Sequence, residues 1–252
     1  MASATSRYRS MRSKVLRGMN RTGKFDRRSV LAGLGAAGVL LPLLNGKSSA
    51  QDQWFPLAGD DGKPVPNMRL PVELTSEVED LKGLFWIGSQ TPDVTMVEFY
   101  DYNCPYCRKA VQEIAALLEN TPGVRVGLVN NPVLSRDSVA AAKVEVALLR
   151  LRGSDVAYEF HRKLFQHRGR INGVRALELA VELGTSQQAV EEASNGSAVE
   201  QIVSAQLRLA ASLGFAATPS FLIAGAGVLG YPGPEALSNI VASVRACDQI
   251  TC

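Results

Sequence analysis

The chain has 252 residues, of which 46% are hydrophobic and 20% are charged, and this balance excludes a disordered, collagen-like or disulfide-dense chain. Its formal net charge of +3 is unevenly distributed, because residues 1–50 hold ten basic residues and one acidic residue, whereas residues 51–252 hold seventeen basic and twenty-three acidic residues. Because acidic residues outnumber basic ones in residues 51–252, this part of the chain lacks the basic face that nucleic acids require. We therefore expect no nucleic-acid partner.

The first fifty residues have the layout of an export signal. A basic segment ends in Arg27-Arg28, an apolar run follows as far as Leu44, and small residues close the segment at Ser48–Ala50. The paired arginines resemble a twin-arginine signal, although Asp26 stands where Ser or Thr is usual. We expect export to the periplasm, where disulfides persist. An uncleaved membrane anchor is the alternative, although the apolar run is shorter than the roughly 20 residues that span a bilayer.

Residues 51–83 are rich in Gly, Pro and Asp and predict an irregular arm. Beyond the arm, β-branched and aromatic residues predict a short strand at 85–87 and buried strands at 95–100 and 124–129. Apolar positions at helical spacing predict a helix over 104–119, between the two buried strands. A strand–helix–strand unit of this kind implies a parallel pair with a right-handed crossover.

The remaining chain divides into a helical stretch and a hairpin that is followed by a helix. Residues 136–213 predict several helices separated by Gly or Asn. Extended segments at 220–224 and 228–231 flank Gly225-Ala226-Gly227, which predicts a hairpin turn. Pro234 opens a final helix, since proline suits the first helical turn.

Cys104-Pro105-Tyr106-Cys107 stands where the first buried strand gives way to a helix. At a helix N-terminus, unpaired backbone N–H groups and the positive end of the dipole favour the thiolate of Cys104, and the thiolate is the nucleophile. Cys107, one turn further on, is shielded. Disulfide exchange requires such an exposed attacker and protected resolver, and a stabilised thiolate makes the disulfide form a stronger oxidant.

Other uses of the cysteines stay open. Cys247 and Cys252, near the C-terminus, can add two thiolates to the first pair in a zinc site. The first pair alone can serve as a copper(I) or zinc clamp, or as a structural disulfide. Our prediction is that no metal is bound and that a structural disulfide between Cys247 and Cys252 staples the tail.

The segment Glu98–Cys107 resembles the active-site segment of exported DsbA-like thiol–disulfide oxidoreductases. Its Cys-Pro-Tyr-Cys pair, together with a Thr before proline, is similar to the ScsC-like members. The resemblance covers residues 84–246 and implies an α/β, thioredoxin-like fold over 84–252, with a helical insertion at about 136–213 between the strand–helix–strand and hairpin–helix halves. It also implies that no cofactor is needed beyond the redox-active Cys104–Cys107 disulfide.

The resemblance implies roles for further residues. Thr218-Pro219 matches a cis-proline segment that faces the cysteine pair and offers its backbone to an extended substrate; without the resemblance, a proline at the start of an edge strand is the alternative. Glu98 matches an acid below the active site that assists proton transfer, because a desolvated carboxyl can accept the proton of Cys107; a Glu98 that points to solvent is the alternative. The expected substrate contacts are Pro105, Tyr106 and Thr218.

The sequence therefore predicts an exported enzyme that exchanges disulfides with the cysteines of protein substrates. Oxidation is favoured over isomerisation or reduction, a membrane redox partner is expected to re-oxidise the enzyme, and the short arm favours a monomer. His161 and His167 lie six residues apart, a spacing that does not place them one helical turn apart, so we expect both in a solvated helix and loop rather than in a metal site.

Overall fold

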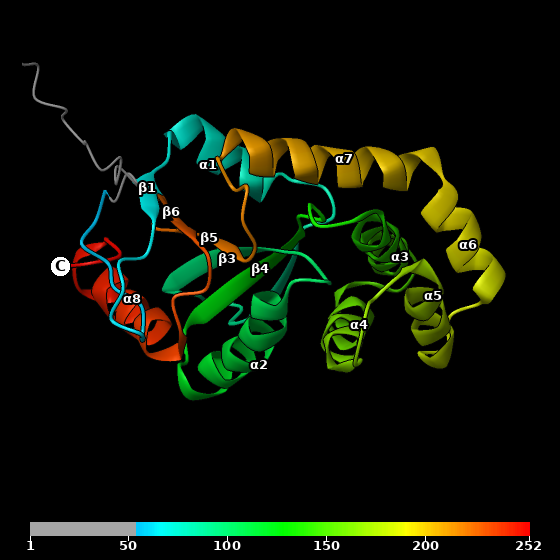
Figure 1. Cartoon of the computed structure of the whole chain (residues 1–252), viewed down its shortest axis with the longest axis horizontal. Helices are drawn as coiled ribbons and strands as arrows, with labels where there is room; N and C mark the ends of the chain where they lie inside the picture. The colour runs from blue at the N-terminus through cyan, green and yellow to red at the C-terminus, as the bar shows by residue number, and fades with distance from the viewer. Residues whose placement is uncertain (1–53) are drawn as a thin grey trace, which may run out of the picture. The chain divides into compact units, whose positions relative to one another are not determined.

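The computed structural model describes residues 54–252, so the predicted export signal at 1–50 lies outside the described residues. Six strands form one sheet in the order β1-β6-β5-β3-β4-β2, and helices pack on both of its faces (Figure 1). The strands are β1 (Asn67–Arg69), β2 (Phe85–Gly88), β3 (Val94–Tyr100), β4 (Val124–Asn130), β5 (Ser220–Ile223) and β6 (Ala226–Leu229). The helices are α1 (Val72–Glu79), α2 (Pro105–Asn120), α3 (Arg136–Arg152), α4 (Ser154–Gln166), α5 (Gly173–Glu182), α6 (Gln187–Asn195), α7 (Ser197–Ser212) and α8 (Pro234–Cys247).

β3 is the central strand that leads into the cysteine pair. It pairs in parallel with β4 and antiparallel with β5, and α2 makes the crossover from β3 to β4. Because side chains alternate along a strand, Val97 and Phe99 pack in the core under α7, whereas Met96 packs in the core under α2. The α/β, thioredoxin-like fold class predicted from the sequence is confirmed.

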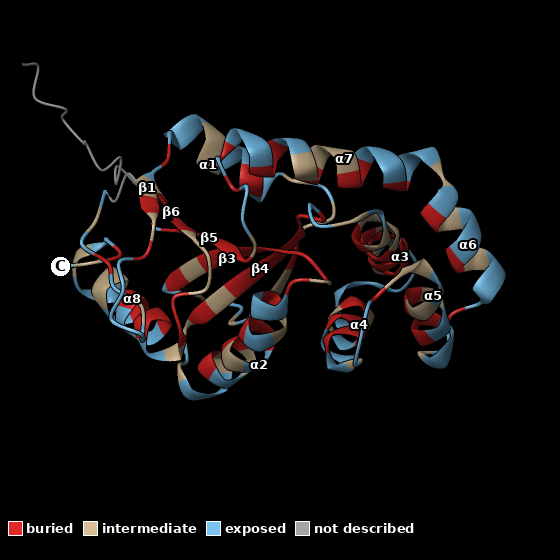
Figure 2. Ribbon diagram, in the orientation of Figure 1, coloured by how far each residue is buried: buried red, intermediate tan, exposed pale blue. Residues whose placement is uncertain are grey.

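Five helices, α3 to α7, occupy the predicted insertion between β4 and β5. α3 lies at its centre, because it contacts each of the other four helices, and much of its surface is buried (Figure 2). Ala141, Ala142 and Ala147 are fully buried there. Small side chains at these positions allow several helices to approach α3 at once, since the side chains at a contact set the distance between helix axes.

The segment that the sequence predicts as an irregular arm, 51–83, contains two regular elements. β1 pairs antiparallel with β6 and extends the sheet at its edge. α1 follows Pro71 and buries Val78 in the core under α7. Elements of three and eight residues are too short to give a clear hydrophobic period, and their contacts with distant elements stabilise them instead.

Asp60, within the same arm, caps the last helix. Its carboxylate accepts hydrogen bonds from the backbone N–H groups of Glu235 (3.1 Å) and Ala236 (2.8 Å) at the start of α8. Such N–H groups have no partner within a helix, and a negative charge is stabilised at this end of the helix dipole. The arm is thereby attached to an element that follows it by 175 positions, a contact that no local pattern reveals.

The hairpin between β5 and β6 turns earlier than the sequence predicts. Ala224 (φ 47°) and Gly225 (φ 71°) form the turn, and Ala226 already belongs to β6. Positive φ at both central residues gives the two-residue turn whose twist matches its flanking strands. Sequence reasoning missed Ala224 because a residue with a Cβ atom rarely adopts this conformation.

Cys247 and Cys252 form the predicted disulfide, with an S–S distance of 2.06 Å. The bridge closes a short loop after α8, and Ile250 within this loop is 1% exposed. The end of the chain is therefore attached to the core by a side chain as well as by the bridge.

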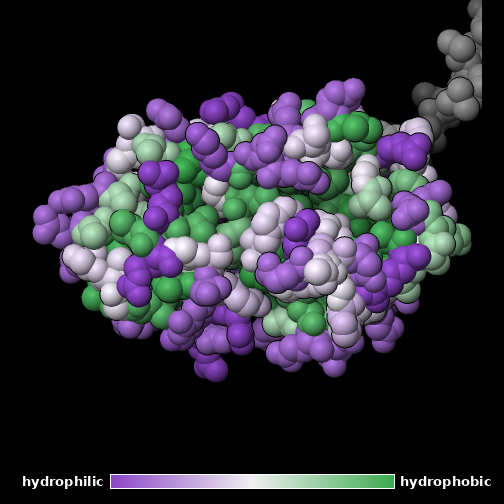
Figure 3. Space-filling view, turned by 180° about the vertical axis from the view of Figure 1, so that it is seen from behind, coloured by the Kyte–Doolittle hydropathy of each residue, from purple (hydrophilic) through white to green (hydrophobic). Residues whose placement is uncertain are grey.

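Within residues 54–252, no helix combines the length and the hydropathy of a membrane span. Hydrophobic residues are visible between hydrophilic ones on the face opposite to that of Figure 1 (Figure 3). Eight large hydrophobic side chains of the described residues are exposed. Three of them, Tyr106, Val133 and Leu134, belong to the Cys-Pro-Tyr-Cys motif or to the loop after β4.

Candidate active site

Cys104 and Cys107 lie where β3 gives way to α2. Cys104 directly precedes the first helical turn, and its sulfur accepts a hydrogen bond from the backbone N–H of Cys107 at 3.5 Å. Pro105 begins the helix. Its missing N–H costs no hydrogen bond there, because the first N–H groups of a helix have no partner within the helix. Both thiols are free. Cys104 is 4% exposed and Cys107 is fully buried, so an attacking molecule can reach only Cys104.

The two thiols differ in acidity. The pKa of Cys104 is lowered to about 6, chiefly by a hydrogen bond from Cys107 and further by Thr218 and backbone N–H groups of α2, against the opposing effect of burial. Burial raises the pKa of Cys107 well above its usual range. A thiol that ionises near neutral pH thus stands beside a thiol that keeps its proton, which is the asymmetry that disulfide exchange requires.

Thr218-Pro219 meets the cysteine pair from the start of β5. The peptide bond between them is cis, and the Cys104 thiol donates to the carbonyl oxygen of Thr218 at 3.0 Å. The Thr218 hydroxyl is buried and, within residues 54–252, makes no hydrogen bond while Cys104 is a thiol; when Cys104 ionises, the Thr218 side chain contributes to the lowered pKa of that thiol. β5 lies between β3 and β6, so Pro219 does not begin an edge strand.

Glu98 is buried in β3. It is 1% exposed, and in the part of the chain that the structure describes its Oε2 atom has no hydrogen-bond partner. Burial, with a smaller contribution from the charge of Cys104, raises the pKa of this carboxyl to about 8. The alternative that Glu98 points to solvent is therefore wrong, and the carboxyl holds a proton at neutral pH.

The expected substrate contacts lie at the surface beside Cys104. Pro105 is exposed, and Tyr106 is 63% exposed. A pocket of about 420 Å³ adjoins Tyr106, and its lining includes Lys109 of α2 and Lys63 of the arm. The arm thus contributes to the surface around the motif, which the sequence did not indicate.

A buried polar cluster that the sequence did not reveal lies behind the motif. The Glu145 carboxylate of α3 accepts hydrogen bonds from the hydroxyls of Tyr100 and Tyr102 and from the side-chain amide of Asn130. His161 of α4 is 1% exposed, and its Nδ1 atom lies 3.4 Å from this carboxylate, so the expectation of a solvated His161 is wrong. Tyr100 ends β3 and Tyr102 lies in the turn that follows, and the helical period of α3 does not show that Glu145 meets them.

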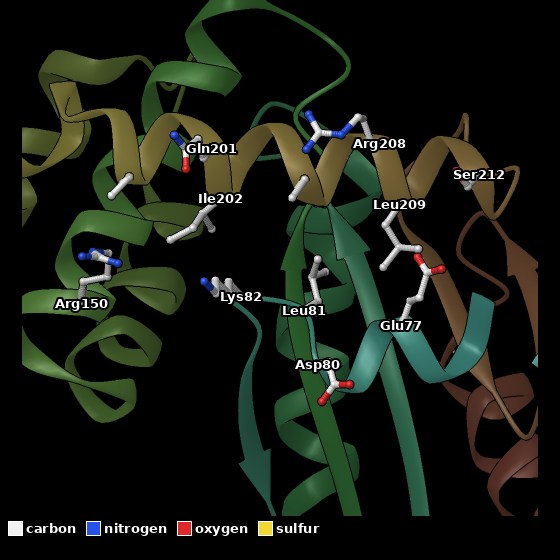
Figure 4. A pocket seen from close by; sticks show the side chains of 12 residues that line it. Glu77, Asp80, Leu81, Lys82, Arg150, Gln201, Ile202, Arg208, Leu209 and Ser212 are labelled. Carbon is white, nitrogen blue, oxygen red and sulfur yellow. The ribbon is translucent and has the colours of Figure 1, made fainter. Parts of the chain in front are cut away.

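A larger pocket, of about 680 Å³, lies between α1 and α7 (Figure 4). Leu81, Ile202 and Leu209 line it together with charged side chains at its rim. None of the predicted site residues lines this pocket. Among residues 54–252, no three His, Cys, Asp or Glu side chains gather as metal ligands would.

The sequence and the fold both match known proteins. Residues 81–243 match a family model described as thioredoxin. A thioredoxin-like oxidoreductase from Silicibacter pomeroyi DSS-3 is 32% identical, with a TM-score of 0.61 over 67% of this chain and 95% of that chain. No curated protein matches the chain.

Two further structures share the fold at lower identity. The thiol-disulfide exchange protein alpha-DsbA2 from Wolbachia pipientis is 21% identical, with a TM-score of 0.60 over 68% of this chain and 94% of that chain. The catalytic domain of Proteus mirabilis ScsC is 23% identical, with a TM-score of 0.60 over 69% and 97%. The fold is therefore similar to those of DsbA-like and ScsC-like proteins, and the chain belongs to the thioredoxin family.

Proposed function

We propose that this protein is an exported thiol–disulfide oxidoreductase that oxidises cysteine pairs of other proteins through its Cys104–Cys107 disulfide. The observation that carries the proposal is the difference between the two thiols: Cys104 ionises with a pKa of about 6, whereas Cys107 is fully buried and keeps its proton. A thiolate stabilised in the reduced protein makes the corresponding disulfide a stronger oxidant.

The reaction has two exchange steps. A substrate thiolate attacks the Cys104 sulfur of the disulfide, so that a mixed disulfide forms and Cys107 leaves with the electron pair. A second substrate thiolate then attacks the substrate sulfur of the mixed disulfide and releases Cys104 as a thiolate. The substrate loses two electrons and two protons and gains one disulfide, while the enzyme is reduced to its dithiol.

Glu98 is suited to supply the proton that Cys107 needs as it leaves. Its carboxyl is protonated at neutral pH because its pKa is about 8, and its charge contributes to the raised pKa of Cys107, so the two groups interact. Because this pKa lies near neutral pH, the carboxyl can donate a proton in the oxidising reaction, and the carboxylate can accept a proton in the reverse reaction.

The backbone of Thr218 is suited to bind the substrate. Its carbonyl oxygen lies 3.0 Å from the reacting sulfur, so an extended segment that carries the substrate cysteine passes beside it. Pro219 has no N–H that competes for that segment. Pro105 and Tyr106, both exposed next to Cys104, complete the proposed contact surface.

To turn over, the enzyme must pass two electrons to a second disulfide-bearing protein, and we assign this role to a membrane redox partner in the periplasm. The protein acts as a monomer and needs no dissociable cofactor in this proposal. The reduction potential of the Cys104–Cys107 pair distinguishes an oxidase from an isomerase or reductase of the same fold. A potential near that of glutathione or above supports oxidation, and one well below it supports reduction.

Trapping of the mixed disulfide tests the proposal. In Cys107→Ala the substrate cannot be resolved by the second thiol, so a covalent adduct through Cys104 accumulates when the protein meets a protein disulfide such as that of insulin. The matched variant Cys104→Ala keeps the buried thiol and forms no adduct. Metal analysis of the same wild-type preparation separates exchange from a copper or zinc clamp, because retained metal without any adduct rejects the proposed exchange.

A further inference from the structure

The segment between α4 and α5 is hydrogen-bonded to both flanks of the cysteine motif. The side-chain amide of Asn103 donates to the carbonyl oxygen of Ile171, and the backbone N–H of Ile171 donates to the Asn103 oxygen, each at 2.8 Å. The guanidinium of Arg108 donates to the carbonyl oxygens of Phe165 and His167. The exposed Arg168 lies between these attachment points, so its backbone is fixed beside the active site.

The loop after β4 is attached to the motif in a similar way. The buried carboxylate of Asp101 accepts hydrogen bonds from the backbone N–H groups of Asn103 (2.8 Å) and Leu134 (2.9 Å). The Asn103 amide also donates to the hydroxyl of Ser138 in the first turn of α3, at 3.0 Å. The exposed Arg136, the first residue of α3, stands two positions before Ser138.

Charge in the attached segments is strongly one-sided. Residues 101–109, 131–138 and 165–172 together hold five basic residues and two acidic residues, although residues 54–252 as a whole hold seventeen basic and twenty-two acidic residues. Both acids are already engaged, since Asp101 is buried with its two backbone donors and Asp137 pairs with Arg170 at 2.5 Å.

In these three segments, three exposed cations have no carboxylate partner among the described residues. Arg136 and Arg168 lie on the side of the helical insertion, and Lys109 lies on α2, where its ammonium stands 5.6 Å from the centre of the Tyr231 ring. We call Lys109, Arg136 and Arg168 the cationic rim. Long-range attraction steers partners of opposite charge to such a rim even where each exposed pair adds little to affinity.

We propose that the cationic rim makes this enzyme selective for substrate segments that carry acidic residues close to the reacting cysteine. The inference rests on the proposed function, because it concerns the substrates of that same exchange. The rim acts on the encounter between enzyme and substrate and leaves the exchange chemistry unchanged. Screening by salt removes the selectivity, since the Debye length falls from about 10 Å at 0.1 M to about 3 Å at 1 M.

Three peptides that differ only beside a single cysteine test this inference. The flanking residues are Glu, Gln or Lys, and each peptide's own thiol pKa is measured so that rates refer to the thiolate. The second-order rate of mixed-disulfide formation with the oxidised enzyme is followed at low and high salt. We expect the Glu peptide to react about two- to fivefold faster than the Lys peptide at low salt, and equally fast at high salt.

Variants that remove cations at different places on the surface locate the effect. In Arg136→Gln/Arg168→Gln, two exposed side chains lose their charge while Lys109 keeps its own, and the ratio of Glu to Lys rates is expected to fall towards one. Arg208→Gln removes an exposed cation at the pocket between α1 and α7 and should leave that ratio unchanged. Thermal unfolding of each variant checks that the fold is kept.

The outcomes separate this inference from the proposed function. If the wild-type enzyme reacts with the Gln peptide but shows no preference between Glu and Lys, the selectivity is refuted while the exchange activity stands. An unchanged ratio in the double variant refutes the assignment to Arg136 and Arg168. If no peptide forms a mixed disulfide through Cys104, the proposed function itself is wrong.

Discussion

The sulfur of Cys104 lies 3.0 Å from the carbonyl oxygen of Thr218, although 114 positions separate the two residues in the chain. As a thiol, Cys104 donates to this carbonyl, and the donor disappears when the thiol ionises. The carbonyl is then available to a substrate backbone, while the Thr218 hydroxyl is available to donate to the thiolate. Loss of the Cys104 proton, on ionisation or in the disulfide, therefore frees the proposed substrate contact at Thr218.

Thr218→Val tests this coupling. Loss of the hydroxyl removes one donor to the thiolate, so the pKa of Cys104 should rise above about 6 and the reduction potential of the pair should fall, by up to about 30 mV for each pKa unit. Thiolate absorbance at 240 nm against pH measures the pKa, and equilibration with glutathione measures the potential. Thr218→Ser keeps the hydroxyl and should keep both values; equal shifts in the two variants would point to packing instead.

Cys107 should control the acidity of Cys104 through its hydrogen bond. The bond from Cys107 is the largest cause of the lowered Cys104 pKa, so in Cys107→Ala the midpoint of Cys104 alkylation by iodoacetamide should move upward from about 6. Cys107→Ser restores a donor at the same place and should recover part of the shift. If the midpoint stayed at about 6 in both variants, the backbone N–H groups of α2, rather than the hydrogen bond from Cys107, would be what stabilises the thiolate.

Glu98→Gln should stabilise the protein in a pH-dependent way. The folded-state pKa of Glu98 is raised to about 8, so the native protein holds a proton that the unfolded chain releases near pH 4.5. The free energy of unfolding therefore falls as pH rises from about 4.5 towards 8, and glutamine removes this loss. At pH 7 we expect a gain on the order of 2 kcal/mol in urea unfolding, and at pH 4 almost none. A gain of equal size at both pH values would mean that ionisation is not its source.

The arm offers a pair of adjacent carboxylates with different roles. Asp60→Ala removes the cap of α8 and should lower the free energy of unfolding by about 1 kcal/mol. Asp61→Ala removes an exposed ion pair with Lys63 and an exposed hydrogen bond from the Lys63 backbone N–H, and such exposed contacts contribute little. Comparison of the two variants by urea unfolding isolates the cap, and the cap prediction fails if both variants behave alike.

The tail disulfide should stabilise the protein without a part in exchange. Cys247→Ser/Cys252→Ser opens a loop with a sequence separation of 5, and loop-closure entropy predicts a loss of about 2 kcal/mol in the free energy of unfolding. Mixed-disulfide formation through Cys104 should continue at an unchanged rate. A large loss of that rate would instead connect the tail to the redox centre.

The longer strands and helices could be predicted from local patterns of residue type and hydrophobic spacing, because those patterns extend over many residues. The β-branched and aromatic residues of β3, the helical spacing of α2 and the long helical stretch from α3 to α7 all appear in the sequence. Cys104 and Cys107 were found by a motif whose place at a strand–helix junction has a physical reason. The role of Pro219 needed the family resemblance, since proline alone predicts no cis bond.

Contacts between distant segments were beyond sequence reasoning. Asp60 at α8, and the meeting of His161 with Glu145, join parts of the chain that share no period or motif. The charge of the cationic rim was hidden in the same way, because the sequence gives an acidic body but not which cations the fold leaves unpaired. Short elements such as β1 and α1 were missed because few of their residues are buried.

The pairing of β1 with β6 also bears on how the chain completes its fold during synthesis. The arm leaves the ribosome early, but β6 and α8, to which β1 and Asp60 attach, are among the last elements made. Until then, β1 lacks the strand with which it pairs, and an open strand edge invites pairing with other molecules. Attachment of the arm therefore acts as a late closing step that shields a newly made molecule from aggregation.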